Sequence, residues 1–468
     1  MSGIFGSASK KSCTNDLFYG TDYLSHLGTK RGGIAVLNGT GIKRVIHSLE
    51  RSYFRTKFES ELPGLEGNIG IGVISDHEAQ PILMRSHLGL FGLVTVSKIN
   101  NIEALVEKAF RKKQTFAEIG GNNMNPTELV AKLICEKDSL SEGIAHAQKC
   151  IKGSCTILLV SDNGGIFAAR DRLGRTPLIV GKKKNGFAVS SESCAFPNLG
   201  YEMERELGPG EIVRITPEGC EELKKPGKDM QICSFLWVYY GYPASTYEGL
   251  NVEDVRYKCG AALAQKDNVM VDFVAGIPDS GIGHGIGYAN AKMLPHKRPF
   301  VKYTPTWPRS FMPQNQDMRD LVARMKLIPI KELIRGQRIL FCEDSIVRGT
   351  QLKDTIKLLF ELGVKQAHMR PACPTLIYPC PFLNFSQSRS TLDLIGRKAI
   401  SQIVGQEEEN LEVFAKAGSP ENLAMIENIR VRLGLSSLKF QALDDLVKAI
   451  GLPKKDLCTH CWDSSSYF

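Results

Sequence analysis

Two adjacent acids, Glu343 and Asp344, follow a short apolar run and precede a loop of hydroxyl, basic and glycine residues. The apolar run, residues 339–341, predicts a buried strand, and apolar side chains at positions 352, 356, 359 and 360 have the spacing of a helix over residues 350–362. Hydroxyls, a guanidinium and the open N–H groups of a helix start all favour an anion, so this loop is suited to hold a phosphate. The loop consists of Ser345, Ile346, Val347, Arg348, Gly349 and Thr350.

The two carboxylates need a separate explanation. Side by side, Glu343 and Asp344 would repel a phosphate unless they hold sugar hydroxyls or a metal ion. The combination therefore indicates a sugar phosphate as the ligand. The alternative is an ordinary turn between a strand and a helix, in which both acids face the solvent.

The order of strand, acid pair and loop resembles the phosphoribosyl pyrophosphate (PRPP) motif of type I phosphoribosyltransferases. The neighbouring sequence has the elements that such a site needs, because helical stretches such as 252–265 and 284–293 alternate with strand-like segments. These segments are residues 272–277, 300–303, 338–341 and 366–370. We expect a parallel sheet with crossover helices, an α/β domain over residues 231–468, and ligands at the carboxyl ends of its strands.

Two more expected strand ends carry polar loops. Asp279, Ser280 and Gly281 lie in a stretch that resembles the pyrophosphate loop of this family, although the same residues also make a common turn. Lys302 and Tyr303 end another expected strand, and a basic segment with Arg309 and Lys326 resembles the mobile loop that closes over PRPP. The resemblance implies Glu343, Asp344 and Lys326 as catalytic residues and Mg²⁺ at Ser280, Glu343 and Asp344. It implies PRPP binding by the remaining residues of these loops and by residues 345–350.

Length and composition set the frame for this site. A chain of 468 residues, 43% hydrophobic and 23% charged, should form two or more globular domains. The net charge of +9 is scattered and lacks aromatic-interleaved basic blocks, so we expect no nucleic-acid partner. The apolar runs are too short to span a bilayer, and the N-terminus does not have the pattern of a signal peptide. We expect a cytoplasmic location, no membrane contact and thirteen reduced cysteines.

The N-terminal half, residues 1–230, is rich in short strands and turns interrupted by helical stretches, which predicts an α+β sandwich. It resembles the N-terminal-nucleophile (αββα) glutaminase domain of glutamine PRPP amidotransferases. The matching segments are residues 1–6, 67–72, 169–178, 190–195 and 209–213. A charged stretch, residues 221–228, contains Pro226 and Gly227 and predicts a linker to the second domain.

The glutaminase chemistry of this family is not matched. Its nucleophile is a cysteine at the second position, whereas this chain has Ser2, a much weaker nucleophile. Residues 73–77, directly after Gly72, contain no arginine, residues 90–97 lack the Asn-Gly pair of oxyanion donors, and Pro126 stands where the family has an acid. Cys13 is better explained as a loop cysteine than as a relocated nucleophile. We expect an inactive glutaminase fold, and the alternative is an altered but working glutamine site.

Four cysteines suggest a metal centre. Cys458 and Cys461 have metal-ligand spacing, and Cys233 and Cys380 stand where one subgroup of these amidotransferases has its other two iron–sulfur ligands. The resemblance implies a [4Fe–4S] cluster of structural role, and Zn²⁺ is the alternative for four thiolates.

The resemblance covers nearly the entire chain and implies formation of 5-phosphoribosylamine from PRPP and ammonia, the first step of de novo purine synthesis. Two alternatives stay open: a silent PRPP-binding or regulatory paralogue, and a fully glutamine-dependent amidotransferase. The family also implies purine nucleotide effectors and a homodimer or homotetramer.

Overall fold

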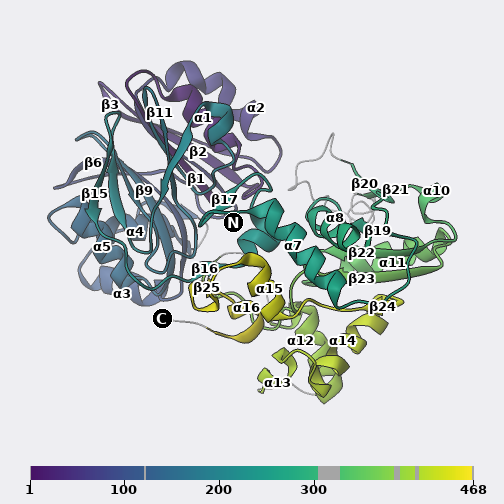
Figure 1. The fold of residues 1–468 in the computed structure, drawn as a ribbon. Coiled ribbons are helices and arrows are strands. Elements are labelled where there is room, and N and C mark those ends of the chain that lie inside the picture. Colours follow the sequence, from purple (N-terminus) through teal and green to yellow (C-terminus); the bar gives the residue numbers. More distant parts are fainter. Residues whose placement is uncertain (1, 121–122, 304–326, 384–390, 406–409, 466–468) are drawn as a thin grey trace.

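The computed structural model of the protein describes residues 2–120, 123–303, 327–383, 391–405 and 410–465. Two parts lie side by side, a β-rich N-terminal part and an α/β part, and the last segments of the chain return to the junction between them (Figure 1). All thirteen cysteines lie in the described ranges and are free thiols. No helix within these ranges is long and apolar enough to cross a membrane.

The N-terminal part is built on two packed sheets. The first has the order β13-β11-β12-β1-β4-β2-β3 and the second has the order β15-β14-β10-β9-β6-β5. The first sheet comprises β1 (Ser2–Ser9), β2 (Arg31–Asn38), β3 (Gly41–Ser48), β4 (Ile69–Ser75), β11 (Ile179–Lys183), β12 (Gly186–Ser190) and β13 (Glu202–Glu206). The second comprises β5 (Ile82–Ser86), β6 (Gly89–Ile99), β9 (Gly153–Ser161), β10 (Ile166–Ala169), β14 (Ile212–Ile215) and β15 (Cys220–Lys224).

Alternation of side chains explains why helices cover both outer faces of this sandwich. Ile71 and Val94 face the other sheet in the inner core, whereas Phe91 and Leu93 share an outer core with Leu129 on α4. The layers are therefore αββα, as the sequence predicted. The covering helices are α1 (Thr14–Asp22) and α2 (Phe54–Phe58) on one side, and α3 (Ile102–Arg111), α4 (Pro126–Ile134) and α5 (Leu140–Cys150) on the other.

The α/β part contains a four-stranded parallel sheet in the order β19-β22-β23-β24. Its strands are β19 (Phe273–Gly276), β22 (Arg338–Glu343), β23 (Gln366–Pro371) and β24 (Ser437–Leu438). Val274 and Leu340 belong to the core on one face, whereas Phe273 and Phe341 belong to the core on the other, so both faces of the sheet are buried. The helices of this part are α7 (Val252–Gln265), α8 (Gly281–Lys292), α11 (Thr350–Glu361), α12 (Ile395–Val404), α14 (Pro420–Leu433) and α15 (Leu443–Ile450).

Two sequence-based assignments were wrong in detail. Residues 300–303 do not extend the parallel sheet, because β20 (Phe300–Lys302) pairs antiparallel with β21 (Leu327–Pro329) in a separate two-stranded sheet. Proline at 299 has no N–H and limits pairing before β20. The expected linker begins later than predicted, since residues 220–224 form the edge strand β15. Its charged side chains suit an edge.

The chain end closes the structure at the junction. The short strand β16 (Ile232–Cys233) pairs in parallel with β25 (Leu457–Cys458), which is followed by α16 (His460–Asp463). A single-turn π-helix, η2 (Leu236–Tyr240), follows β16 and packs on α7. Ser234 Oγ donates to the carbonyl of Cys458, so residues 224 positions apart are joined beside both parts of the molecule (Figure 1).

We predict that Phe341→Ala lowers the free energy of unfolding of the α/β part by about 3–5 kcal/mol, because it removes a fully buried ring from the central strand. The matched variant is Phe360→Ala on α11, whose ring is 43% exposed, and it should change stability by less than about 1 kcal/mol. Urea unfolding followed by circular dichroism measures both. Equal effects would contradict the assignment of β22 as the core strand.

Candidate active site and thiol cluster

The acid pair lies where the central strand β22 ends. Ile277 donates a backbone hydrogen bond to Cys342 O at 2.9 Å, which brings the loop after β19 directly beside this strand end. Gly281 comes so close to β22 that a Cβ there would meet the carbonyl oxygen of Cys342 at 2.4 Å. Glycine is therefore required at the first residue of α8, and the two loops form one site at the carboxyl edge of the sheet.

Hydroxyl groups hold the two acids in place. Ser280 Oγ donates to Asp344 Oδ1 at 2.5 Å and lies 3.4 Å from Glu343 Oε1, while Ser345 Oγ donates to Asp344 Oδ2 at 2.6 Å. Asp344 is buried, with 5% of its surface exposed. The three residues expected to hold Mg²⁺, Ser280, Glu343 and Asp344, are thus in mutual hydrogen-bond reach.

Burial and the neighbouring Asp344 carboxyl group both shift the pKa of Glu343. The pKa of Glu343 is raised well above its usual value, first because the group is withdrawn from water and second because Asp344 is negatively charged beside it. The raised pKa favours the protonated form of Glu343, whereas a bound cation would favour its ionised form.

The pyrophosphate-loop residues lie next to the acids. Asp279 forms an ion pair with Lys302, so the loop before α8 contacts β20 although β20 is outside the parallel sheet. Tyr303 follows Lys302 and is 37% exposed. Arg309 and Lys326 lie outside the described residues.

The loop before α11, which the sequence predicts to hold a phosphate, is anchored by packing and by a backbone hydrogen bond. Gly349 precedes the helix with φ of 74°, and a Cβ at this residue would meet Ile395 Cδ1 at 2.4 Å. Ile346 is buried, and the carbonyl of Val347 accepts from Ile395 N at 2.7 Å, so these two residues anchor the loop. Thr350 starts the helix, and its side chain is exposed. Arg348 is also exposed and lies 3.5 Å from Asp393.

Sequence reasoning missed two basic groups behind the site. Arg256 on α7 is buried and donates to the carbonyls of Trp237, Tyr239 and Gly241, so it fixes the π-helix η2. His284 on α8 bonds Val238 O at 3.1 Å. Burial and, secondly, Arg256 lower the pKa of His284 to about 4, so it is neutral at pH 7. Neither residue lies in a recognisable sequence pattern.

Ser2, at the position of the family's nucleophile, contacts another hydroxyl. Its Oγ lies 2.9 Å from Ser75 Oγ, which also accepts from His77 N at 3.0 Å. No imidazole, amine or guanidinium of the described residues hydrogen-bonds the Ser2 hydroxyl. Arg31 faces Ser75 from β2, and its Nε donates to His77 O at 3.1 Å. Sequence reasoning missed this arginine because it is on a different strand from Gly72.

A closed polar network occupies the region beyond Ser75. Gln80 is fully buried, and its side-chain amide bonds both the N–H and the carbonyl of Thr95. Thr127 Oγ1 lies 2.8 Å from Thr95 Oγ1 and 3.1 Å from Glu78 Oε1. The stretch without an Asn-Gly pair, residues 90–97, is the regular interior of β6. Side chains of this chain therefore satisfy one another here.

Two further residues of the sandwich, Glu128 and Cys13, are buried. Glu128 accepts from the backbone N–H groups of Ala117 and Glu118 and is buried. Cys13 is completely buried, and burial raises the pKa of its thiol to about 12. A thiol that stays protonated at neutral pH is a poor nucleophile.

The four expected cluster cysteines come from three segments that lie together. Cys233 is in register with Cys458 across β16 and β25, and Cys461 O accepts hydrogen bonds from the backbone of Ile377 and Tyr378. A hydrogen bond from Cys461 is the main reason why the pKa of Cys380 is lowered to about 6. Among the described residues, no group of three or more His, Cys, Asp or Glu side chains has an arrangement that could hold a metal ion.

Donors from the N-terminal part and from the loop itself surround these thiols. Arg175 Nη1 donates to Cys458 Sγ at 3.2 Å, and its guanidinium lies 3.3 Å from the ring centre of Phe382. Leu383 N donates to Cys380 Sγ at 3.3 Å, and Lys98 donates to the carbonyl of Cys380. Such donors stabilise negative charge on thiolate sulfur, so the donor set fits a metal cluster.

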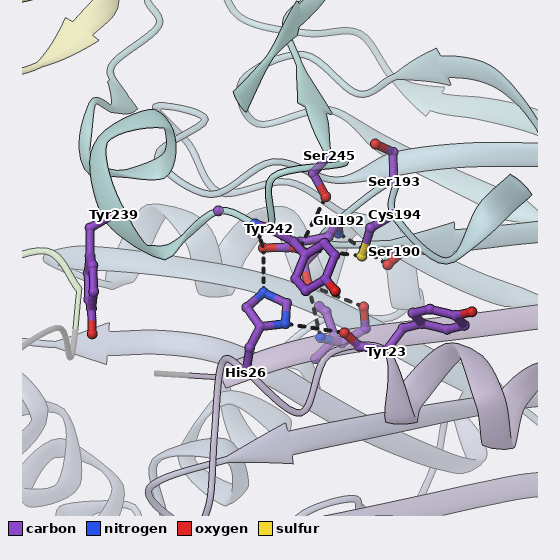
Figure 2. A network of polar contacts seen from close by, with 12 residues as sticks. Tyr23, His26, Ser190, Glu192, Ser193, Cys194, Tyr239, Tyr242 and Ser245 are labelled. Carbon is purple, nitrogen blue, oxygen red and sulfur yellow. Dashed lines mark hydrogen bonds and ion pairs between the residues drawn. The ribbon is translucent and has the colours of Figure 1, made fainter. Parts of the chain in front are cut away.

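A second buried network joins the two parts of the molecule (Figure 2). Glu192, 1% exposed, accepts from His26 Nε2 at 3.0 Å, from Ser245 Oγ at 3.1 Å and from the backbone of Tyr242 at 3.4 Å. His26 comes from the segment after α1, whereas Tyr242 and Ser245 follow the π-helix η2. One carboxylate thus ties the sandwich to the segment that Arg256 and His284 support.

Fold and site together define a two-part protein, an N-terminal-nucleophile glutaminase-type sandwich joined to a type I phosphoribosyltransferase-type domain. A family described as "Glutamine amidotransferase domain" matches residues 66–198. Amidophosphoribosyltransferases from Methanocaldococcus jannaschii and Bacillus subtilis are each 28% identical to this chain over 98% of its length, covering 96% and 92% of the relatives. The chain is a relative of the amidophosphoribosyltransferases along nearly all of its sequence.

Solved structures agree with this relationship. The glutamine PRPP amidotransferase of B. subtilis, complexed with ADP and GMP, superposes with a TM-score of 0.84 at 26% identity. The match covers 99% of this chain and 96% of that chain. Both parts of the fold, and not only one of them, are therefore shared with that enzyme.

Proposed function

We propose that this protein makes 5-phosphoribosylamine from PRPP and ammonia, the first step of de novo purine synthesis, and that it has lost glutaminase activity. The observation that carries the proposal is the contact of Ser280, from the pyrophosphate loop, with the acid pair at the end of β22. The similarity to amidophosphoribosyltransferases over 98% of the chain supports the same reaction.

Each group of the site has a role in this reaction. Residues 345–350 bind the 5-phosphate, and Asp279, Ser280, Gly281 and Lys302 face the pyrophosphate. Glu343 and Asp344 hold the ribose 2- and 3-hydroxyls and stabilise positive charge that develops on the ring. The nitrogen of ammonia bonds to the anomeric carbon, the bond from that carbon to pyrophosphate breaks, and the amine releases a proton.

The donor set of the site fits Mg²⁺, because Ser280, Glu343 and Asp344 offer the hard oxygen ligands that this ion prefers. When bound, Mg²⁺ supplies charge neutralisation for the departing pyrophosphate.

Three features of the sandwich support the loss of glutaminase activity. Ser2 contacts only another hydroxyl among the described residues, Gln80 fills hydrogen-bonding positions on Thr95, and Glu128 is committed to backbone N–H groups. Catalysis by this class of site depends on nucleophile, base and oxyanion donors acting together. A serine in these surroundings lacks such a set.

The nitrogen donor is tested by measuring pyrophosphate release from PRPP with ammonium chloride and, separately, with glutamine. We expect turnover with ammonium and less than about 1% of that rate with glutamine, since loss of one oxyanion donor alone costs about 100-fold or more. Comparable turnover with glutamine would show that the glutamine site works, and Arg31 would then be the arginine to examine. No turnover with either donor would instead indicate a PRPP-binding or regulatory paralogue.

We predict that Asp344→Asn lowers turnover by at least about 100-fold without unfolding the protein, because the amide keeps the shape but removes the charge that faces the ribose. Asp254→Asn on α7, which removes a carboxylate from an exposed position, is the matched control and should keep full activity. Steady-state kinetics and a thermal melt are measured for both. Wild-type turnover in Asp344→Asn would remove the proposed ribose-binding role.

We further propose that Cys233, Cys380, Cys458 and Cys461 hold a [4Fe–4S] cluster. In such a cluster each thiolate binds a different iron atom, whereas zinc requires four sulfur atoms about 2.3 Å from one centre. The donors on these sulfur atoms support the cluster, because Arg175 donates to Cys458 and Leu383 donates to Cys380. Its role is structural, because the ligands join the start, middle and end of the transferase part.

Protein purified without oxygen should contain about four iron and four inorganic sulfide per chain, with a broad visible absorption. Cys380→Ser should lose most of this iron, while Cys135→Ser, at the end of α4 in the sandwich, should retain it. Metal analysis and sulfide determination decide the question. About one zinc per chain without sulfide would establish the zinc alternative.

We also propose that purine nucleotides regulate this protein and that it forms a homo-oligomer. The relative from B. subtilis was solved with ADP and GMP, which supports purine nucleotides as effectors of this chain too. A homodimer or homotetramer is the assembly that we propose.

A further inference from the structure

A cavity lies in the N-terminal part, and neither the acid pair nor Ser2 is among its lining residues. It has a volume of about 430 Å³ and lies between the end of α5, the start of β9 and the turn that follows β10. This volume is within the range of about 300–1,000 Å³ that is typical of small-molecule sites. None of the residues that line this cavity takes part in the proposed reaction.

Two buried oxygens in the cavity wall have unused hydrogen-bonding capacity. Gln148 and Ser154 line the cavity and are only 5% and 2% exposed. Gln148 Oε1 and Ser154 Oγ have no hydrogen-bond partner among the described residues, although Gln148 Nε2 donates to Arg170 O and so fixes the amide. Buried polar atoms are almost always paired in folded proteins, so these two indicate a missing polar partner.

Positive charge dominates the mouth of the cavity. Lys149, Lys152 and Arg172 line it with exposed side chains, and none of the three forms an ion pair within the described part of the chain. The one carboxylate in the lining, Asp171, accepts hydrogen bonds from Leu173 N and Thr176 N in its own turn. The three cations are therefore free to bind an anion.

We propose that this cavity binds a phosphorylated small molecule, with its phosphate between Lys149, Lys152 and Arg172 and its polar body against Gln148 and Ser154. A phosphate is the anion that suits three cations at the mouth of one cavity, because it carries close to two charges and several acceptor oxygens. Gln148 Oε1 and Ser154 Oγ are almost completely covered, so a bound ligand reaches them only after a small side-chain rotation.

The site is next to the thiol cluster. Arg175 lines the same cavity and donates to Cys458 Sγ, so a ligand in the cavity lies one side chain away from a cluster cysteine. The cavity therefore borders the junction between the two parts, and it is separate from the PRPP loops.

Lysine acylation of the full chain, read by peptide mass spectrometry, tests the proposal locally. The probes are AMP and ribose 5-phosphate, and the comparators are adenosine and inorganic phosphate. We expect both probes to slow acylation of Lys149 and Lys152 several-fold, while exposed Lys57 on α2 reacts at an unchanged rate. Equal protection by adenosine, equal protection by inorganic phosphate, or no protection by either probe would each overturn the proposal.

Variants separate this site from the transferase site. Lys152→Ala combined with Arg172→Ala should weaken binding of AMP, measured by protection of Lys149, by about tenfold or more. The matched control removes two exposed cations elsewhere, Lys57→Ala with Arg51→Ala, and should leave that binding unchanged. Protection must also persist in Asp344→Asn. Its loss there would place AMP in the PRPP site and contradict a separate cavity.

Discussion

Two carboxyl groups kept side by side at the end of one strand are the constraint on which the rest of the structure depends. Their repulsion is relieved by Ser280 and Ser345, which donate to Asp344, and by the raised pKa of Glu343. Ser280 can reach the pair only because Gly281 allows α8 to start against β22. The sheet, the glycine and the hydroxyls together therefore place the carboxyl pair at one edge of the sheet, beside the loops that precede α8 and α11.

The sandwich keeps the glutaminase fold while its polar residues serve other contacts. Gln80, Thr95 and Thr127 satisfy one another, and Ser2 is hydrogen-bonded to Ser75. The same part supplies Glu192, Arg175 and Lys98 to the junction, where they hold the segment after β16 and the thiol-bearing loops. The sandwich therefore supports the neighbouring part of the molecule through these contacts, whatever its own chemistry, because fold alone does not imply activity.

Much of this architecture follows from the sequence, because hydrophobic periodicity and local loop composition determine it. Helix α7 has the predicted bounds, and the strand, acid pair and glycine loop around Asp344 lie as expected. Contacts between distant segments could not be predicted in this way. Arg31 faces Ser75 only through strand register, and Arg256 reaches three carbonyls only through tertiary packing. Strand β20 was misassigned because its pairing partner, β21, is set by topology rather than composition.

The parallel pairing of β16 with β25 has a consequence for biosynthesis. Residues 232–233 cannot be paired until residues 457–458 have left the ribosome, so β16 stays without this partner while the segments between them are made. Until then Cys233 and Cys380 lack Cys458 and Cys461 as neighbours. A nascent chain would therefore expose these two thiols to oxidation, and the pairing of β16 with β25 brings the four cysteines together.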